Sequence, residues 1–409
     1  MDLQARQFCK LINSILHSSQ NITLNDEVDW TQLARLAKEH NLLPIFMEEA
    51  VKYPAYVSHP EYGKVMQETM HTVAKQVQRT HAFLELYRSF VENRLYPIVI
   101  KGLICRQLYG DLCDHRPSGD EDILIQLAEY DKAKEILINN GYVTEFEEET
   151  EAQLEQLQEI SFISPETGLH IELHLNIMGR ENDARTRMTD YFADVFDNYR
   201  EVEIEGVVVR TMTHQTHLFY LILHAFKHFT GGGFGIRQML DILLYQEKYG
   251  AEIDLNKLHE ELVEFKADAL WNDLIHIGNL YLGFELKAFQ DPNCPEELLE
   301  DMFQCGTFGN KTQAEIAAAR MTTIATGDYL KKESGNSFVI LLRTIFPSRA
   351  FLMNQFPYLE EKPWLLPVEW VKRWGRFLKR SRKNENNLAV ESMKISQRRM
   401  KLLKKYGVV

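Results

Sequence analysis

Two aspartates separated by one residue, Asp120 and Asp122, are the side chains of this sequence best suited to metal chemistry. They begin an apolar run that is typical of a β-strand. Alternate side chains of a strand share a face, so the two carboxylates project together while Glu121 points to the opposite side. Paired carboxylates form a hard-oxygen site for Mg²⁺, which keeps several waters and completes its shell with phosphate oxygens. The pattern predicts a metal-dependent phosphate site at the start of this strand.

A lysine–glycine pair, Lys101 and Gly102, follows a short apolar strand predicted over residues 97–100 and begins a helix. Gly102 would let a phosphate approach the N–H groups of the helix N-terminus, where the helix dipole favours anions, and Lys101 could add a point charge. Together with Gly119 at the entry of the aspartate strand, they are candidates for binding nucleotide phosphates. Taken alone, the tetrapeptide Gly-Asp-Glu-Asp could also be a plain turn that enters a strand.

A third carboxylate is supplied by a β-hairpin predicted over residues 161–175, whose turn contains proline and glycine. In its second strand His170, Glu172 and His174 alternate with aliphatic residues, so one face is apolar and the other carries three potential ligands. We expect Glu172 to join the paired aspartates as the third acid of a magnesium site, with His170 or His174 orienting it or touching phosphate. A zinc site from the His-x-Glu-x-His run and a merely solvated strand face are the alternatives.

Two helical patterns further along the chain add candidates for nucleotide binding. His224 and His228 lie one turn apart and could approach a phosphate or the acceptor, although packing between helices is the plainer interpretation. Three glycines at 231–233 precede Arg237 and Asp241, which share a face of the next predicted helix and could simply pair with each other. The alternative is a mobile glycine lid over the nucleotide, with Arg237 among the nucleotide-binding residues.

These motifs, in this order, resemble the uncharacterised bacterial nucleotidyltransferase family of the DNA polymerase beta-like superfamily. Further segments agree: DWTQLARLAKEHNLLP from residue 29, HLFYLILHAFKH from 217, RQMLD from 237 and WLLP from 364. The resemblance implies transfer of a nucleoside monophosphate from a nucleoside triphosphate to a hydroxyl acceptor, which could be a small molecule, a sugar or a protein. It implies Asp120, Asp122 and Glu172 as catalytic and metal-binding residues, with Mg²⁺, or alternatively Mn²⁺, as cofactor.

The sequence departs from the superfamily pattern at three places. Lys101-Gly102-Leu103 stands where Gly-Gly or Gly-Ser is usual, the charged Glu121 separates the aspartates where an apolar residue is usual, and the third acid is Glu172 rather than aspartate. Two rival functions therefore stay open. One is a catalytically degenerate nucleotide-binding or protein-interaction module of the same fold. The other is a kinase-like phosphotransferase that uses the same site.

The elements around these motifs predict an α+β protein in which a nucleotidyltransferase-type mixed β-sheet is flanked by N-terminal and C-terminal helical regions. A plausible N-cap at Asp29 and a long helix from about residue 62 to 93 belong to the first helical region. The expected regions are an N-terminal helical region over 1–95, the sheet over 96–210, a helical domain over 211–335 and a C-terminal segment over 336–409.

Composition indicates an ordinary globular protein. Of its 409 residues 45% are hydrophobic and 11% aromatic, which is ample for packed cores. The sequence has no apolar run near 18 residues and no small-residue cleavage site near its N-terminus, and its five cysteines lack a paired ligand spacing. We therefore expect a cytoplasmic protein with reduced thiols.

Charge is distributed unevenly along the chain. The net charge of -13 argues against a broad nucleic-acid-binding surface. From residue 362 onward, however, basic residues outnumber acidic ones, and apolar side chains recur at helical spacing among them: Trp370, Val371, Trp374, Phe377 and Leu378. Such a basic amphipathic tail could bind a lipid surface, RNA or an acidic partner, or dock on the acidic body of its own chain.

Overall fold

The computed structural model describes residues 1–17, 27–146, 150–180, 183–306, 356–359, 362–372 and 388–408, together with residues 24, 349, 352 and 375. Three positions of the predicted amphipathic tail helix, Trp374, Phe377 and Leu378, lie outside them, as does the predicted helical domain after residue 306. Within the described ranges, no helix combines the length and the apolarity that a membrane span requires.

The described residues form one sheet of six strands in the order β3-β4-β2-β1-β6-β5. The strands are β1 (Ile98–Val99), β2 (Asp120–Leu124), β3 (Glu159–Ile163), β4 (His170–His174), β5 (Tyr199–Ile204) and β6 (Val207–Met212). β2 runs parallel to β4 and β1 parallel to β6, while the other neighbours are antiparallel. The predicted hairpin is confirmed as β3 and β4, and the mixed sheet with its many helices confirms the predicted α+β class.

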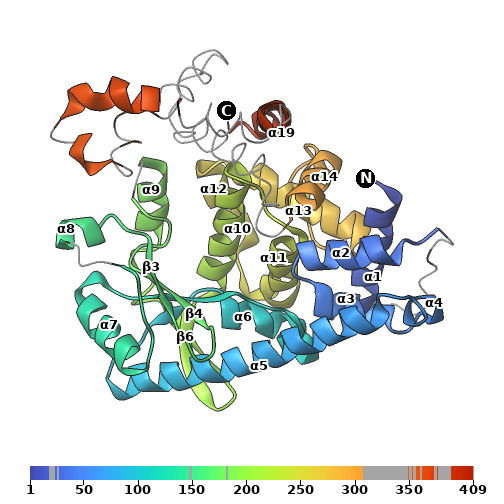
Figure 1. Ribbon diagram of the computed structural model, residues 1–409, viewed down its shortest axis with the longest axis horizontal. Coiled ribbons are helices and arrows are strands. Elements are labelled where there is room, and N and C mark those ends of the chain that lie inside the picture. The colour runs from blue at the N-terminus through green and yellow to red at the C-terminus, as the bar shows by residue number, and fades with distance from the viewer. Residues whose placement is uncertain are drawn as a thin grey trace.

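Helices precede the sheet, as the sequence predicts (Figure 1). They are α1 (Leu3–His17), α2 (Trp30–Glu39), α3 (Leu43–Ala50), α4 (Pro54–Val57) and α5 (Tyr62–Glu92). The predicted N-cap is confirmed, because the Asp29 carboxylate accepts a hydrogen bond from the Gln32 N–H at 2.9 Å. α5 has the length predicted for it and runs along the sheet (Figure 1).

Shorter helices connect the strands, and a group of longer ones follows the sheet. The connecting α-helices are α6 (Gly102–Arg106), α7 (Tyr130–Asn139), α8 (Glu151–Leu154) and α9 (Asp183–Tyr191), with 3-10 helices η1 (Gln107–His115) and η2 (Leu127–Glu129). After β6 come α10 (His214–Thr230), α11 (Ile236–Tyr249), η3 (Gly250–Glu252), α12 (Leu255–Glu264), α13 (Asp268–Tyr281) and α14 (Pro295–Cys305). The later described elements are η4 (Pro357–Leu359), η5 (Pro363–Leu365) and α19 (Leu388–Lys405).

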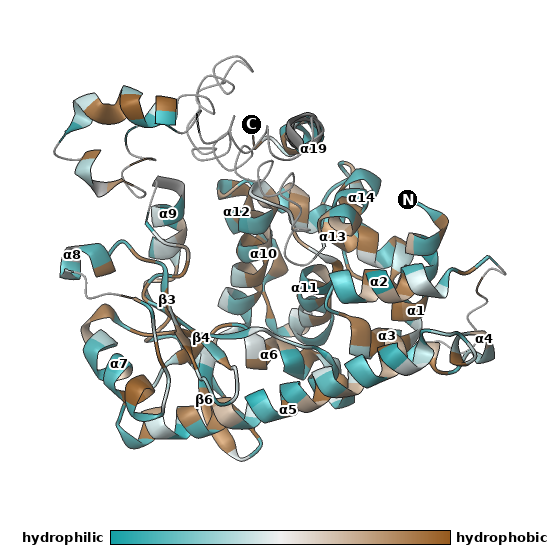
Figure 2. Cartoon of the chain, viewed as in Figure 1, coloured by the Kyte–Doolittle hydropathy of each residue, from teal (hydrophilic) through white to brown (hydrophobic). Residues whose placement is uncertain are grey.

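The two faces of the sheet pack against different helices. Ile123 of β2 and Leu173 of β4 belong to a core shared with α5 and α7. Leu124 of β2, which points the other way, belongs to a core shared with α10 and α11. Figure 2 shows hydrophobic residues along the strands between these two layers. Because side chains alternate along each strand, the polar residues at 120, 122, 172 and 174 lie on the α10 face.

One hydrophobic core joins the helices before the sheet to those after it. It contains Phe8 and Phe46 from the first group and Ile236 and Trp271 from the second. A buried hydrogen bond connects the same two groups, since His40 Nδ1 accepts from the Ile236 N–H at 3.2 Å. Helices α1–α4 and the helices after β6 therefore form one packed layer beside the sheet.

The basic helix α19 packs on this layer. Arg399 is buried, pairs with Asp301 of α14 and donates a hydrogen bond to the Phe229 carbonyl oxygen at the end of α10. Lys405 pairs with Glu297 of α14 at 2.5 Å, and apolar residues of α19 enter the shared core. This part of the basic tail contacts the acidic side chains of its own chain.

Candidate active site

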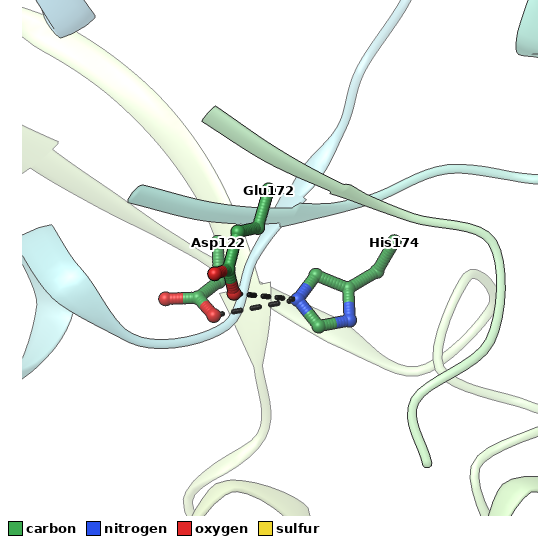
Figure 3. A group of neighbouring side chains, drawn as sticks. All are labelled: Asp122, Glu172 and His174. Atoms are coloured by element: carbon green, nitrogen blue, oxygen red, sulfur yellow. Dashed lines mark hydrogen bonds and ion pairs between the residues drawn. The ribbon is translucent and has the colours of Figure 1, made fainter. Parts of the chain in front are cut away.

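The centre of the α10 face is a compact group of three side chains, Asp122, Glu172 and His174 (Figure 3). It arises from the parallel pairing of β2 with β4, whose register places Asp122 opposite Glu172 and Leu124 opposite His174. One potential ligand atom from each of the three residues lies within 4.8 Å of the others. A non-local strand pairing thus assembles a group that could hold a metal ion.

The histidine of this group is surrounded by carboxylates. His174 Nε2 lies 3.3 Å from Asp122 Oδ1, 3.6 Å from Glu159 Oε2 and 3.8 Å from Glu172 Oε2. Glu159 comes from β3, where it pairs with His174 in register. Sequence reasoning missed Glu159, which lies two residues before the predicted hairpin. Extending the antiparallel pairing of that hairpin back to the position opposite His174 could have found it.

Lys101 contacts the group of Asp122, Glu172 and His174. Its Nζ donates a hydrogen bond to Asp122 Oδ1 at 2.8 Å, and its side chain is 17% exposed. Lys101 is the N-cap residue of α6, which follows β1, the strand next to β2 in the sheet. The predicted lysine is therefore next to the predicted aspartate, while its contact with phosphate stays a prediction.

Two observations test whether these residues suit a metal ion. Asp122 is buried, and its Oδ2 has no hydrogen-bond partner among the described residues. A buried carboxylate oxygen without a partner is costly unless a ligand completes it. The donors are mainly carboxylate oxygens, which Mg²⁺ and Mn²⁺ prefer, with one imidazole at the side. The group fits a divalent ion on both counts.

Asp120 occupies the outer end of the site. It pairs in register with His170, two residues before the Asp122–Glu172 pair on the same two strands, and it is half-buried. The compact group contains His174 in the place where the sequence predicted Asp120, so the predicted metal role of Asp120 stays a prediction. His170 is exposed and outside the group, which leaves the His-x-Glu-x-His zinc arrangement unassembled in the described chain.

The protonation of the group follows from its crowding. Burial acts to lower the pKa of His174, but the hydrogen bond to Asp122 and the nearby carboxylates of Glu172 and Glu159 outweigh it and raise this pKa to about 9. Burial would raise the pKa of Asp122, yet Lys101 and His174 hold it well below its usual range. Burial and the neighbouring carboxylates raise the pKa of Glu172 to about 7. At neutral pH the group therefore contains two cations, Lys101 and His174, beside the carboxylate of Asp122.

The opposite side of β2 carries a different arrangement. Glu121 accepts hydrogen bonds from the Leu103 N–H at 2.7 Å and from Arg106 Nη1 at 2.5 Å, and all three residues are buried. Gly102 has φ +36°, and a Cβ atom there would lie 2.0 Å from Glu121 Oε2. The glycine is thus needed for the approach of this glutamate. The phosphate contact predicted at Gly102 stays a prediction, with the Leu103 N–H already engaged by Glu121.

α10 covers the site with a row of ring side chains. Tyr220, His224 and His228 recur at four-residue spacing, and the two histidine rings lie 4.6 Å apart. Burial, helped by the positive charges of Lys101 and Lys227, lowers the pKa of both histidines, that of His228 to about 3, so both are neutral at pH 7.

Tyr220 is a residue of this row that sequence reasoning missed. Its hydroxyl is buried with no hydrogen-bond partner among the described residues. Burial and the negative charges of Asp122 and Glu172 raise its pKa well above the usual value, against the opposing effect of Lys101. The four-residue spacing to His224 was the signal that could have found it.

The pairing of Arg237 with Asp241 that the sequence suggested does not form. Asp241 instead accepts two hydrogen bonds from Arg116, at 2.8 and 2.5 Å, and one from the Tyr109 hydroxyl at 3.0 Å. Arg237 donates from Nη1 to the Pro117 carbonyl oxygen. A bidentate partner from the loop before β2 displaces the local i,i+4 pair, because a buried carboxylate gains more from a fixed fork of two donors. Gly119, in the same loop, is exposed.

Comparison with known proteins gives one match. The family model described as an uncharacterised nucleotidyltransferase matches residues 26–283, which is more than half of the chain and includes the whole sheet, α10 and α11. No curated protein and no solved structure matches. The matched range holds Lys101, the aspartate strand and the acid-x-His strand in one site, and the chain belongs to this uncharacterised nucleotidyltransferase family.

Proposed function

We propose that the protein transfers a nucleoside monophosphate from a nucleoside triphosphate to a hydroxyl group of an acceptor, with a divalent ion at the acidic group. The observation that carries this proposal is the compact group of Asp122, Glu172 and His174 on neighbouring strands, within the range matched by a nucleotidyltransferase family. The group has the acidic donors of a phosphoryl-transfer site and a cation, Lys101, beside it.

Asp122 and Glu172 would hold the metal ion, with Asp120 at the outer end of the same face. Mg²⁺ bound there would neutralise charge on the α-phosphate and on the leaving group. Lys101 donates a hydrogen bond to Asp122 and so places a positive charge beside this carboxylate. The neutral imidazoles of His224 and His228, from α10, offer donors that need no proton uptake at pH 7.

As the alternative to holding the metal ion, Glu172 is suited to accept the proton of the acceptor hydroxyl. Its pKa of about 7 places it near the value at which a general base is both deprotonated and basic. The acceptor oxygen would form a bond to the α-phosphorus as the bond to the β-phosphate oxygen breaks. Pyrophosphate leaves in line, and the hydroxyl proton passes to Glu172.

Calorimetric titration of each nucleoside triphosphate, with and without Mg²⁺, tests the proposal. We expect magnesium-dependent binding by the wild type and its loss in Asp122→Asn. Asp131→Asn is the matched control, since Asp131 is an exposed aspartate of α7 on the other side of the sheet. Equal binding by the wild type and Asp122→Asn would contradict the assignment.

A catalytically degenerate module is the second candidate, and two observations favour it. Lys101 occupies an oxygen of Asp122, and Glu121 occupies the Leu103 N–H at the turn where phosphate was predicted. This candidate predicts binding of nucleotide without turnover, or no binding. An acceptor screen with nucleotide labelled on the α-phosphate separates it from the transferase, and release of nucleoside diphosphate instead of pyrophosphate would indicate a kinase-like reaction.

A further inference from the structure

The described part of the chain buries four arginines, and three of them have a carboxylate partner. Arg106 pairs with Glu121, Arg116 with Asp241 and Arg399 with Asp301. The fourth, Arg237, makes no ion pair within 4 Å of any described acidic residue. Burying a charge without a partner is unfavourable, so the exception needs an explanation.

Besides an ion-pair partner, the guanidinium of Arg237 also lacks hydrogen-bond acceptors for some of its N–H groups among the described residues. It is 7% exposed, and its one hydrogen bond in the described structure runs from Nη1 to the Pro117 carbonyl oxygen. Its Nε is buried without a partner. Burial and the nearby positive charge of Arg116 lower its pKa, and Asp241 is already held by Arg116 and Tyr109. Arg237 is therefore a cation with an unused Nε donor and no ion pair among the described residues.

The position of Arg237 connects it to the acidic group. Pro117 lies three residues before Asp120, in the loop that enters β2. The charge of Asp120 is close enough to act on the pKa of Arg237. Gly119, between them in the loop, is exposed, and a Cβ atom added to it would meet nothing within 4 Å. Arg237 therefore binds the loop whose next exposed residue, Gly119, directly precedes Asp120.

We propose that Arg237 is the anion-binding residue of this site and takes the β- and γ-phosphates of the nucleoside triphosphate. A planar guanidinium with unused N–H groups can donate two parallel hydrogen bonds to phosphate oxygens. Arg237 also lies in the first turn of α11, where the helix dipole favours negative charge. This inference rests on the proposed function and adds to it the residue that recognises the leaving group.

The test measures three probes by calorimetry: ATP with Mg²⁺, AMP with Mg²⁺ and inorganic tripolyphosphate in EDTA. In Arg237→Gln we expect ATP affinity to fall about 10- to 100-fold, toward that of AMP, with AMP binding unchanged. Tripolyphosphate binding should fall by a similar factor. Arg210→Gln is the matched control, because Arg210 is a half-buried arginine of β6 that packs between Tyr96 and Tyr199.

The results for the different variants and probes distinguish this inference from the proposed function. If Asp122→Asn abolishes magnesium-dependent ATP binding while Arg237→Gln binds ATP as the wild type does, the inference is overturned and the proposed function stands. If the wild type binds no nucleotide but binds tripolyphosphate through Arg237, the proposed function fails and the anion site stands. No binding of tripolyphosphate or ATP by the wild type overturns both.

Melting temperatures show whether a loss of binding in Arg237→Gln is caused by misfolding. Without ligand, Arg237→Gln should melt at the same temperature as the wild type or higher, because it removes an uncompensated buried charge. With tripolyphosphate, the melting temperature of the wild type should rise and that of Arg237→Gln should not. A variant that melts markedly lower without ligand would assign Arg237 a purely structural role.

Discussion

Neighbouring residues of one strand, Glu121 and Asp122, meet two different environments. Both carboxylates are buried, and they point to opposite faces of the sheet. Glu121 bonds the Leu103 N–H, Arg106 and the Ser118 hydroxyl, so both of its oxygens are used. Asp122 is bonded by Lys101 and His174 through one oxygen, and its other oxygen has no described partner.

The difference shows how the same chemical group can be structural on one face and available on the other. A carboxylate whose oxygens are all bonded by fixed protein donors contributes to the fold and has no remaining capacity for a ligand. A carboxylate with one open oxygen, next to cations that can move or lose a proton, retains that capacity. We therefore expect changes on the Glu121 face to affect folding and changes on the Asp122 face to affect binding and turnover.

The largest expected effect is on the Glu121 face. Arg106→Met should lower the free energy of unfolding by about 3–5 kcal/mol, since it leaves Glu121 buried without its cation. Urea denaturation measures the change. The double variant Arg106→Met/Glu121→Gln should recover part of the loss. If the single variant were as stable as the wild type, the two faces would not differ as described.

Asp122→Asn tests the other face. Turnover, measured as release of pyrophosphate, should fall about 10²- to 10³-fold, since charge stabilisation at the phosphate is lost. The free energy of unfolding should fall by less than in Arg106→Met, because the amide can still accept from Lys101 and His174 can release its proton. Asp131→Asn should match the wild type in both measurements. A large loss of stability in Asp122→Asn would make Asp122 structural, like Glu121.

The third prediction concerns pH dependence. The folded pKa of His174, about 9, exceeds its unfolded value of 6.5, so its contribution is fully present below pH 6.5 and is lost as pH rises through 9. In EDTA, the free energy of unfolding should therefore fall by up to about 3 kcal/mol over this range. His174→Gln should flatten that part of the profile. Identical profiles for both proteins would contradict a cationic His174.

The smallest expected effect sharpens the comparison at Gly102. Gly102→Ala should cost about 2 kcal/mol, because φ is positive there and the new methyl group would collide with the Glu121 carboxylate. Denaturation compared with that of Gly63→Ala, where a Cβ meets nothing within 4 Å in α5, isolates the contact. A neutral Gly102→Ala would show that Glu121 can leave the turn without cost.

Local pattern was enough to predict the aspartate strand, the hairpin and the long helix α5, because each depends on residues close in sequence. The contacts between side chains of the site could not be predicted in the same way. The pairing of β2 with β4, which sets Asp122 beside Glu172 and brings in His174, depends on a register between segments about 50 residues apart. Arg237 illustrates the same limit, since the partner expected one turn away is taken by Arg116 from another element.

Helix α19 has a consequence for the order in which the chain can fold during synthesis. The bond from Arg399 to the Phe229 carbonyl oxygen spans 170 residues, and it closes the end of the helix that carries Tyr220, His224 and His228. On the ribosome, that helix can fold against the sheet early, but its last turn gains this partner only after residue 399 has left the exit tunnel. Pulsed proteolysis of nascent chains stalled with α19 inside the exit tunnel and with α19 outside it would show whether α10 stays open until then. On this view, maturation of the site waits for the emergence of a helix whose described side chains contact none of the carboxylates of β2 and β4.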